Sequence, residues 1–161
     1  MGNWQNQAAL RLGWGSAASE MVPNFGRMVP FGVVLLDYSQ PAAIFRLPAR
    51  MNFHLGYTVG WGEKYGENWR DYSWPQTGIS LDASLISWGR FYGGTGVGAF
   101  MKWQVDARQD SRFMFMTRAF IGYRATDRFS GEAFIKHYSD GNLTPINGAY
   151  NFVGLGITAG F

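Results

Sequence analysis

The sequence contains no cysteine, and only 16% of its 161 residues are charged. The missing cysteines exclude a disulfide framework and thiolate chemistry. No apolar run approaches the roughly 18 residues that a membrane-spanning helix needs. The net charge of +3 is too small to indicate a polyanionic partner, and we expect no nucleic acid to bind. These absences leave two classes, a soluble single-domain protein and a barrel that crosses a membrane with strands.

Aromatic residues and glycine are abundant instead. Phe, Trp and Tyr make up 17% of the chain, and there are 22 glycines. In residues 45–61 nearly every odd position is apolar or aromatic and nearly every even one is polar, charged or glycine. Such alternation is typical of a strand whose two faces meet different surroundings. Seventeen residues also exceed the roughly 9–11 that a tilted strand needs to cross a bilayer.

The same alternation predicts a complete set of eight strands. Their expected ranges are 6–15, 28–38, 45–61, 79–85, 90–103, 112–124, 129–139 and 151–161, of which 28–38 is apolar on both faces. Turns are expected at 16–26, 39–44, 62–74, 104–110, 125–128 and 140–148. Eight is the smallest usual strand number for an outer-membrane barrel. We therefore predict one domain over 1–161, an all-β, eight-stranded antiparallel transmembrane up-and-down β-barrel.

Side-chain parity assigns the two faces of this barrel. A barrel of eight strands is filled by side chains, so the charged residues on the inner face should form a buried ionic network: Arg46, Arg50, Asp82, Arg118, Arg124, Glu132 and Lys136. His54 is expected inside, with a structural hydrogen bond. The tryptophans lie mostly near strand ends, where interfacial aromatic girdles form: Trp4, Trp14, Trp61, Trp69, Trp74, Trp88 and Trp103. A soluble lipocalin-like barrel fits less well, because its interior could not hold the large apolar set.

Three polar residues break the outward apolar pattern near one rim. His137 and Ser139 are two positions apart, and Asn151 has outward parity on the next strand. If short turns face the periplasm, all three lie at the outer-leaflet interface. A serine hydroxyl becomes a nucleophile when a base takes its proton, and histidine suits that task near neutral pH. Asn151 could orient the imidazole through its carbonyl oxygen.

The loop between these strands could stabilise an oxyanion. Amides near Gly141 and Asn142, and the side chain of Asn147, are the candidate donors. No metal-ligand constellation is visible, and we expect no cofactor. The chemistry predicted from these residues is hydrolysis of an acyl ester in the outer leaflet, where lipid A carries ester-linked chains.

The closing segment resembles a known family. HYSDGNL, followed by PINGAYNFVGLG, is similar to the signature of the PagL-type lipid A 3-O-deacylases, which are eight-stranded outer-membrane enzymes. The resemblance implies hydrolysis of the acyl ester at position 3 of lipid A, with His137 and Ser139 as the catalytic pair. It also implies that Asn147 stands for the family's loop asparagine and that Asn151 stands for the Glu or Asn that is the third member of the catalytic group. Asp140 departs from the family's asparagine, which adds a carboxylate that competes with Asn151 for His137.

We expect an outer-membrane hydrolase acting on lipid A or lipopolysaccharide in the membrane, with a signal peptide already removed because Met1 to Trp4 lack its features. One alternative is a non-catalytic structural or adhesive barrel. Another is an acyltransferase with an internal site, which the inward charges disfavour. The sequence leaves open acyl-chain specificity, latency in intact membranes and a homodimer.

Overall fold

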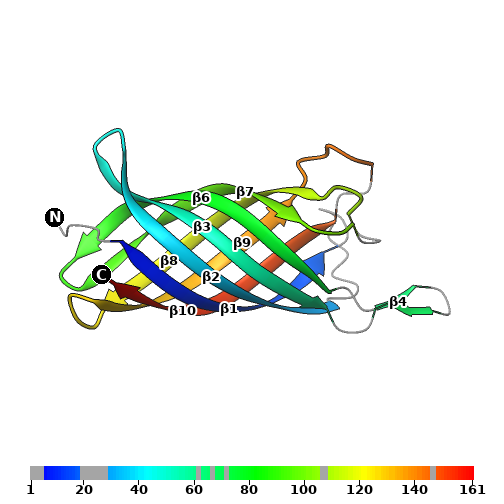
Figure 1. The fold of residues 1–161 in the computed structure, drawn as a ribbon, viewed down its shortest axis with the longest axis horizontal. Helices are drawn as coiled ribbons and strands as arrows, with labels where there is room; N and C mark the ends of the chain where they lie inside the picture. The colour runs from blue at the N-terminus through cyan, green and yellow to red at the C-terminus, as the bar shows by residue number, and fades with distance from the viewer. Residues whose placement is uncertain are drawn as a thin grey trace.

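Eight antiparallel strands form a closed barrel in the computed structural model (Figure 1). The structure describes residues 6–18, 29–60, 63–65, 68–70, 73–105, 109–145 and 148–161. The barrel strands are β1 (Gln7–Ala18), β2 (Val29–Ile44), β3 (Leu47–Gly60), β6 (Ser73–Trp88), β7 (Phe91–Lys102), β8 (Phe113–Arg124), β9 (Phe129–Ser139) and β10 (Ala149–Gly160). Each pairs with its neighbours in chain order, and β1 closes the barrel against β10. The predicted fold class is confirmed.

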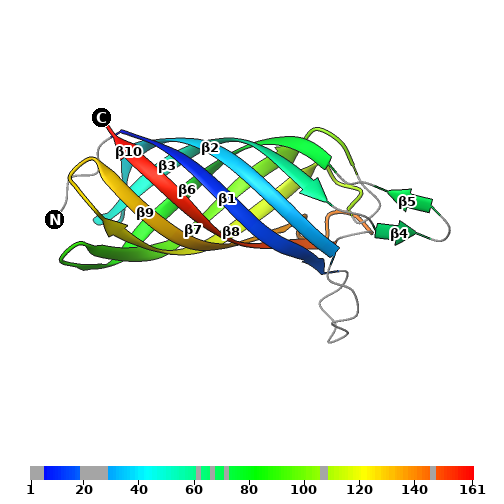
Figure 2. The ribbon, with the colours of Figure 1, turned by 90° about the horizontal axis from the view of Figure 1, so that it is seen from below.

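The two ends of the barrel differ. Both termini lie at one end, together with the short turns at 45–46, 89–90 and 125–128 (Figures 1 and 2). The longer connections lie at the other end, which we call the loop end. One of them carries a separate hairpin of β4 (Glu63–Tyr65) and β5 (Asn68–Arg70). Short turns on the side of the termini and long loops opposite are typical of outer-membrane barrels.

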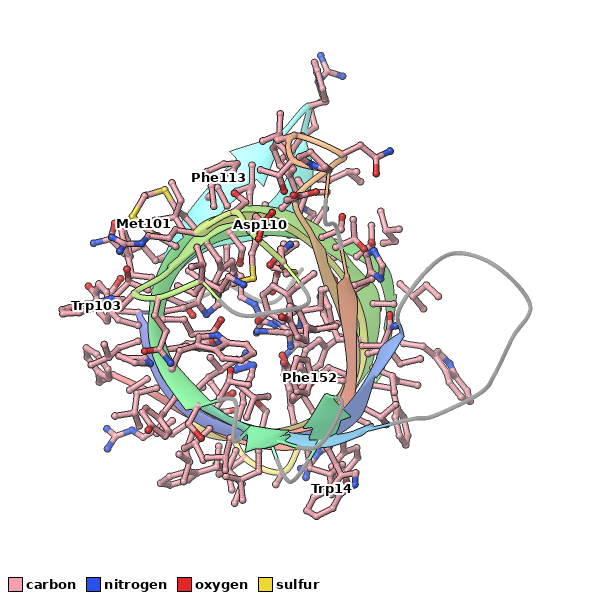
Figure 3. The ribbon with its side chains drawn as sticks, turned by 90° about the vertical axis from the view of Figure 1, so that its right-hand side faces the viewer. Trp14, Met101, Trp103, Asp110, Phe113 and Phe152 are labelled. Carbon is pink, nitrogen blue, oxygen red and sulfur yellow. The ribbon has the colours of Figure 1, made fainter. Side chains whose placement is uncertain are left out.

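Alternation along the strands separates a lipid-facing surface from a filled interior. On β9, Ile135 is 57% exposed while the next residue, Lys136, is fully buried. A view from the loop end shows Phe152 inside the ring and Trp14, Met101 and Trp103 outside it (Figure 3). Within the described residues, no helix is long and apolar enough to cross a bilayer. The exposed apolar face instead belongs to strands.

An ionic cluster fills the middle of the barrel. Glu132 forms ion pairs with three guanidinium groups, those of Arg11, Arg50 and Arg118. Arg50 and Arg118 also bind Asp82. Buried charges need such pairing, because an unpaired one would carry a desolvation penalty of several kcal/mol. The network was predicted for Arg50, Asp82, Arg118 and Glu132, whereas its member Arg11 had not been identified.

Apolar side chains fill the lumen on the loop side of this cluster. Trp74, Phe100, Tyr138, Tyr150 and Phe152 pack there with Val33 and Leu35. The two aliphatic residues explain why β2 is apolar on both faces. Trp74 is 1% exposed and stacks edge-on against Tyr150, so its predicted place in an outer girdle is wrong. Trp14, Trp88 and Trp103 are exposed. The side chains of Trp4, Trp61 and Trp69 lie outside the described residues.

The turn predicted at 39–44 is wrong. β2 continues to Ile44, and the chain reverses at Phe45 and Arg46, both with positive φ. Arg46 is therefore exposed on a turn and does not reach the internal network. Likewise β6 is longer than the predicted 79–85, running from Ser73 to Trp88. The alternation is weak at both places: Pro41 and Ala43 are not polar on the inner parity of β2, and Ser73 and Thr77 are polar on the outward parity of β6.

Candidate active site at the loop end of β9 and β10

A hydrogen bond joins His137 to Asn151 on the outer wall. The two residues are directly paired across β9 and β10, and Nδ1 of His137 lies 2.8 Å from Oδ1 of Asn151. Both are half-buried, while their neighbours Lys136, Tyr138 and Tyr150 point inward and are buried. Since the amide oxygen only accepts, Nδ1 carries the proton in this bond and Nε2 is left as the basic nitrogen.

Ser139 lies on the same face of β9, two residues closer to the loop. Such spacing puts the Cα atoms of His137 and Ser139 about 6.5–7 Å apart. On its other side Ser139 is paired with Phe115 of β8, whose ring is exposed. Among the described contacts the imidazole bonds to Asn151 and has no hydrogen bond to the Ser139 hydroxyl. In enzymes without substrate this bond is often long and tightens only in the complex.

Asp140 organises the loop that follows Ser139. Its buried carboxylate accepts hydrogen bonds from the backbone N–H of Asn142, at 2.9 Å, and from the hydroxyl of Thr144. Gly141 and Asn142 both have positive φ. A Cβ on Gly141 would meet the Phe115 ring at 3.0 Å, so glycine is required there on two grounds. Of the two candidate partners, Asn151 binds the imidazole in this structure.

One polar neighbour of this group was not predicted from the sequence. Thr117 of β8 is exposed and directly paired with His137, on the side opposite Asn151. In the sequence it could have been recognised as a polar residue among the outward-facing Phe113, Phe115 and Ala119. Asn147, the predicted loop donor, lies outside the described residues.

An apolar hollow lies below the polar group. It measures about 520 Å³, and its lining residues are Leu10, Leu12, Gly13, Trp14, Ala133, Val153, Gly154, Leu155, Gly156 and Ile157. Val153 is the next outward residue after Asn151, and Trp14 is paired with it. The hollow therefore follows the barrel wall from Ile157 to Val153, one outward position short of Asn151.

One protein family matches most of this chain. The profile of the family described as "Lipid A 3-O-deacylase (PagL)" matches residues 51–158, which include His137, Ser139 and Asn151. The chain belongs to the PagL family. The comparison with curated proteins gives no match.

Solved structures similar to this PagL-family barrel share its fold. The outer membrane enzyme PagL is 13% identical, with a TM-score of 0.61 over 95% of this chain and 99% of that one. Neisserial surface protein A (NspA) is also 13% identical, with a TM-score of 0.64 over 97% of each chain. At such low identity these likenesses establish the outer-membrane barrel fold and nothing about the reaction.

A second serine–histidine group lies inside the barrel. Nδ1 of His54 is 2.6 Å from Asp37 Oδ1, and its Nε2 is 2.8 Å from the hydroxyl of Ser80. The Ser80 hydroxyl also accepts a bond from Asn52, and Asp37 pairs with Arg11 at 3.0 Å. These five side chains are at most 4% exposed. The arrangement satisfies buried polar groups, as was expected for His54, and leaves no room for a lipid.

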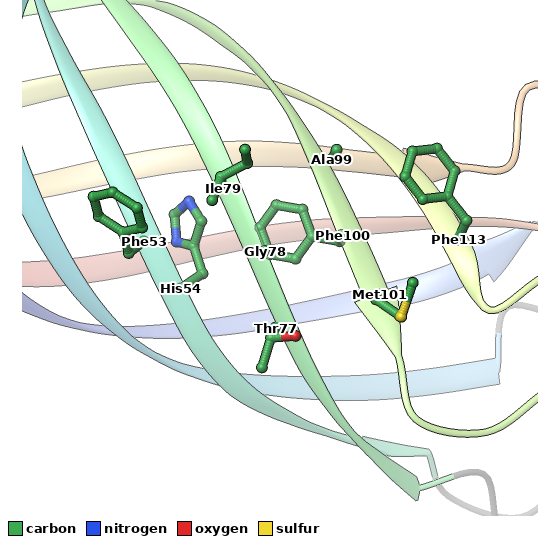
Figure 4. Close-up of a pocket in the computed structure, with 9 residues that line it drawn as sticks. All are labelled: Phe53, His54, Thr77, Gly78, Ile79, Ala99, Phe100, Met101 and Phe113. Carbon is green, nitrogen blue, oxygen red and sulfur yellow. The ribbon is translucent and has the colours of Figure 1, made fainter.

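The wall beside His54 has a shallower hollow of about 410 Å³ (Figure 4). Gly78 lies at its centre with the Phe100 ring next to it, and His54 stacks on that ring with centroids 4.9 Å apart. Both nitrogens of His54 are already bonded to Asp37 and Ser80. The hollow therefore offers no base to a bound molecule. Nor does the described part of this PagL-family chain place three His, Cys, Asp or Glu side chains around a metal position.

Proposed function

We propose that this chain is an outer-membrane esterase that hydrolyses the 3-O-linked acyl ester of lipid A. Membership of the PagL family supports the reaction class. The observation that carries the site assignment is the bond from His137 to Asn151 beside Ser139, on the outward face at the loop end. With the loops outside the cell, this face meets the acyl region of the outer leaflet, where the ester is found.

In the first step Ser139 is the nucleophile. Asn151 holds the Nδ1–H of His137, so Nε2 accepts the hydroxyl proton as Oγ attacks the ester carbonyl. The intermediate collapses when His137 returns this proton to the sugar oxygen at position 3. An acyl-enzyme on Ser139 and a lipid A with a free hydroxyl result. Asn151 orients the ring but adds no negative charge to stabilise the imidazolium.

In the second step water hydrolyses the acyl-enzyme, and His137 removes the proton from the attacking water. The fatty acid then leaves and Ser139 regains its proton. In both steps the negative oxygen needs hydrogen-bond donors. The backbone N–H of Asn142 already donates to Asp140. We therefore assign the oxyanion contact to the N–H of Gly141 and to the side chain of Asn147, with Asp140 and Asn142 shaping the loop.

The apolar hollow supports an acyl substrate. It begins at Val153, one outward position below Asn151, and its lining is almost wholly apolar. A chain lying there would place its ester next to Ser139 while remaining in the hydrocarbon layer. Lipid A reaches the site by diffusing in the leaflet, so no passage through the filled barrel is needed.

The test is direct. The purified protein is incubated with lipopolysaccharide, and mass spectrometry of lipid A follows the loss of one acyl chain. Ser139→Ala and His137→Ala should abolish this loss, whereas Ser87→Ala, an exposed serine near the opposite end of β6, should leave it unchanged. If the parent protein and all three variants leave lipid A intact, the alternative of a non-catalytic barrel gains support, since the fold is shared with a surface protein.

A further inference from the structure

The hairpin between β2 and β3 extends beyond the rest of the barrel. β2 pairs with β1 only as far as Ser39, and β3 pairs with β6 only from Ala49. Residues 40–48 therefore form a two-stranded ribbon, and no strand of the described residues pairs with either of its edges. This ribbon departs sideways from the barrel at the end that carries the termini (Figure 1), and it lies outside the ring in the axial view (Figure 3).

The tip of this ribbon is apolar and fully open. Phe45 is 97% exposed, the highest value among the exposed large apolar residues described, and Leu47 is 42% exposed. Arg46 adds a cation next to Phe45, and it too is exposed. An aromatic ring and a cation side by side match the boundary between acyl chains and phosphate groups.

The backbone conformation at the tip indicates that Phe45 and Arg46 are not there to form the turn. Phe45 has φ of 48° and Arg46 has φ of 82°. Two-residue turns of this kind strongly favour Asn-Gly, because only small or glycine residues adopt positive φ easily. A phenylalanine and an arginine here are held in a backbone conformation that is unfavourable for both residues. Turn formation alone would not select either residue.

Aromatic side chains mark the level of the membrane surface beside the ribbon. Tyr38 stacks on Phe53 at 6.2 Å and on Phe161 at 6.4 Å, all on the outer wall. Such girdles lie at the headgroup level. Gln40, which donates a hydrogen bond to the Tyr38 hydroxyl, begins the ribbon at that level. A ribbon that leaves sideways from there runs along the bilayer surface.

We propose that the β2–β3 hairpin is a membrane-surface anchor, with Phe45 inserted among the acyl chains and Arg46 bound to lipid phosphates. The leaflet it contacts is the one at the end with the termini. With the loop end outside, as in the proposed function, this is the phospholipid leaflet. The anchor itself does not depend on catalysis.

The absence of cysteine in the sequence makes a labelling test simple. Phe45→Cys is labelled with an environment-sensitive fluorophore, and Asp127→Cys, in an exposed turn at the same end, serves as the matched control. Both are reconstituted in vesicles of phosphatidylethanolamine and phosphatidylglycerol. We expect a blue-shifted emission at position 45 that lipid-borne quenchers reduce, and quenching by aqueous iodide at position 127. If iodide quenches position 45 as strongly as position 127, the proposal is overturned, and the tip is open to a protein partner.

A second variant separates anchoring from turn formation. The double change Phe45→Asn with Arg46→Gly supplies the residues that the turn itself prefers. A merely structural turn would then be more stable, and the urea midpoint of the barrel in these vesicles would rise. An anchor predicts a lower midpoint, because the apolar and ionic contacts with lipid are lost. Lipid A deacylation by the same variant in detergent should be unchanged, so failure of the anchor and failure of the esterase assignment remain distinguishable.

Discussion

Asn151 accepts a hydrogen bond from Nδ1 of His137 at 2.8 Å, across directly paired positions of two membrane strands. The pairing fixes the ring orientation through the backbone register, so no loop is needed to place the base. It also places the proton on Nδ1 and leaves Nε2 as the basic nitrogen. The amide differs from a carboxylate in carrying no charge to balance an imidazolium, and this difference can be measured.

Replacing Asn151 tests the orienting role. Asn151→Leu removes the acceptor at similar size, and we expect deacylation to fall about 10–100-fold because the ring loses its fixed tautomer. Asn151→Asp keeps an acceptor and adds charge, so its rate should equal or exceed that of the parent. The measurement is the initial rate of acyl release from lipopolysaccharide in mixed micelles. Equal rates for the parent and the leucine variant would contradict the role.

The two serine–histidine groups should respond oppositely to serine removal. Ser139→Ala should abolish hydrolysis and leave the unfolding midpoint unchanged, since this half-buried residue lies on the outer face of β9 and does not contribute to the packed interior. Ser80→Ala should preserve hydrolysis and lower the midpoint, because His54 and Asn52 lose a buried partner at a cost of about 1–3 kcal/mol. Reaction with a fluorophosphonate probe gives an independent readout, with labelling lost only in Ser139→Ala. Labelling lost in Ser80→Ala would place the reactive serine inside the barrel.

The apolar hollow is tested by filling it. Ala133 of β9 lines the hollow and faces outward. Ala133→Phe should lower kcat/KM for lipid A at least 10-fold, yet affect a short-chain ester much less, because only a long chain occupies the hollow. Val97→Phe is the control, on an exposed lipid-facing position of β7. A uniform loss on both substrates would indicate a disturbed site and contradict a chain-binding role.

Alternation in the sequence was enough to predict the strand number, the barrel and the outward face of His137, Ser139 and Asn151. These follow from backbone geometry, because the period of two assigns each side chain to a face once the strand is recognised. The pairing of His137 with Asn151 needed one more fact, the strand register. The predicted loop at 140–148 is short enough to allow this register, and the structure pairs the two residues directly.

Other features depend on contacts that one strand does not reveal. Asp37 joins the ionic cluster from β2, where the apolar inner residues Val33 and Leu35 hid the polarity of the inner face. The turn at Phe45 carries neither glycine nor asparagine, so no local signal marked it. Thr117 is a neighbour of the site only because the strand register pairs it with His137. In each case the missing information was which residue lies across the sheet.

Asp140 offers a test of loop organisation. Asp140→Ala removes the acceptor for the Asn142 amide and for Thr144. We expect the deacylation rate to fall 10-fold or more while the urea midpoint barely changes, because the loop lies outside the barrel wall. Asp140→Asn retains an acceptor and should recover part of the rate. An unchanged rate in the alanine variant would show that the oxyanion donors do not depend on this loop geometry.

Glu132 tests the contribution of the internal cluster to stability. The carboxylate contacts Arg11, Arg50 and Arg118, and it also accepts a bond from the Tyr92 hydroxyl. Glu132→Gln keeps the shape but removes the charge, leaving three buried guanidinium groups with Asp37 and Asp82 as carboxylate partners. Breaking a buried pair in this way costs about 3–5 kcal/mol, so the urea midpoint should fall sharply. Arg112→Gln, an exposed charge beyond the barrel wall, is the control and should shift it little. Similar midpoints for both variants would mean that the aromatic packing near the loop end, and not the ionic cluster, sets the stability of the barrel.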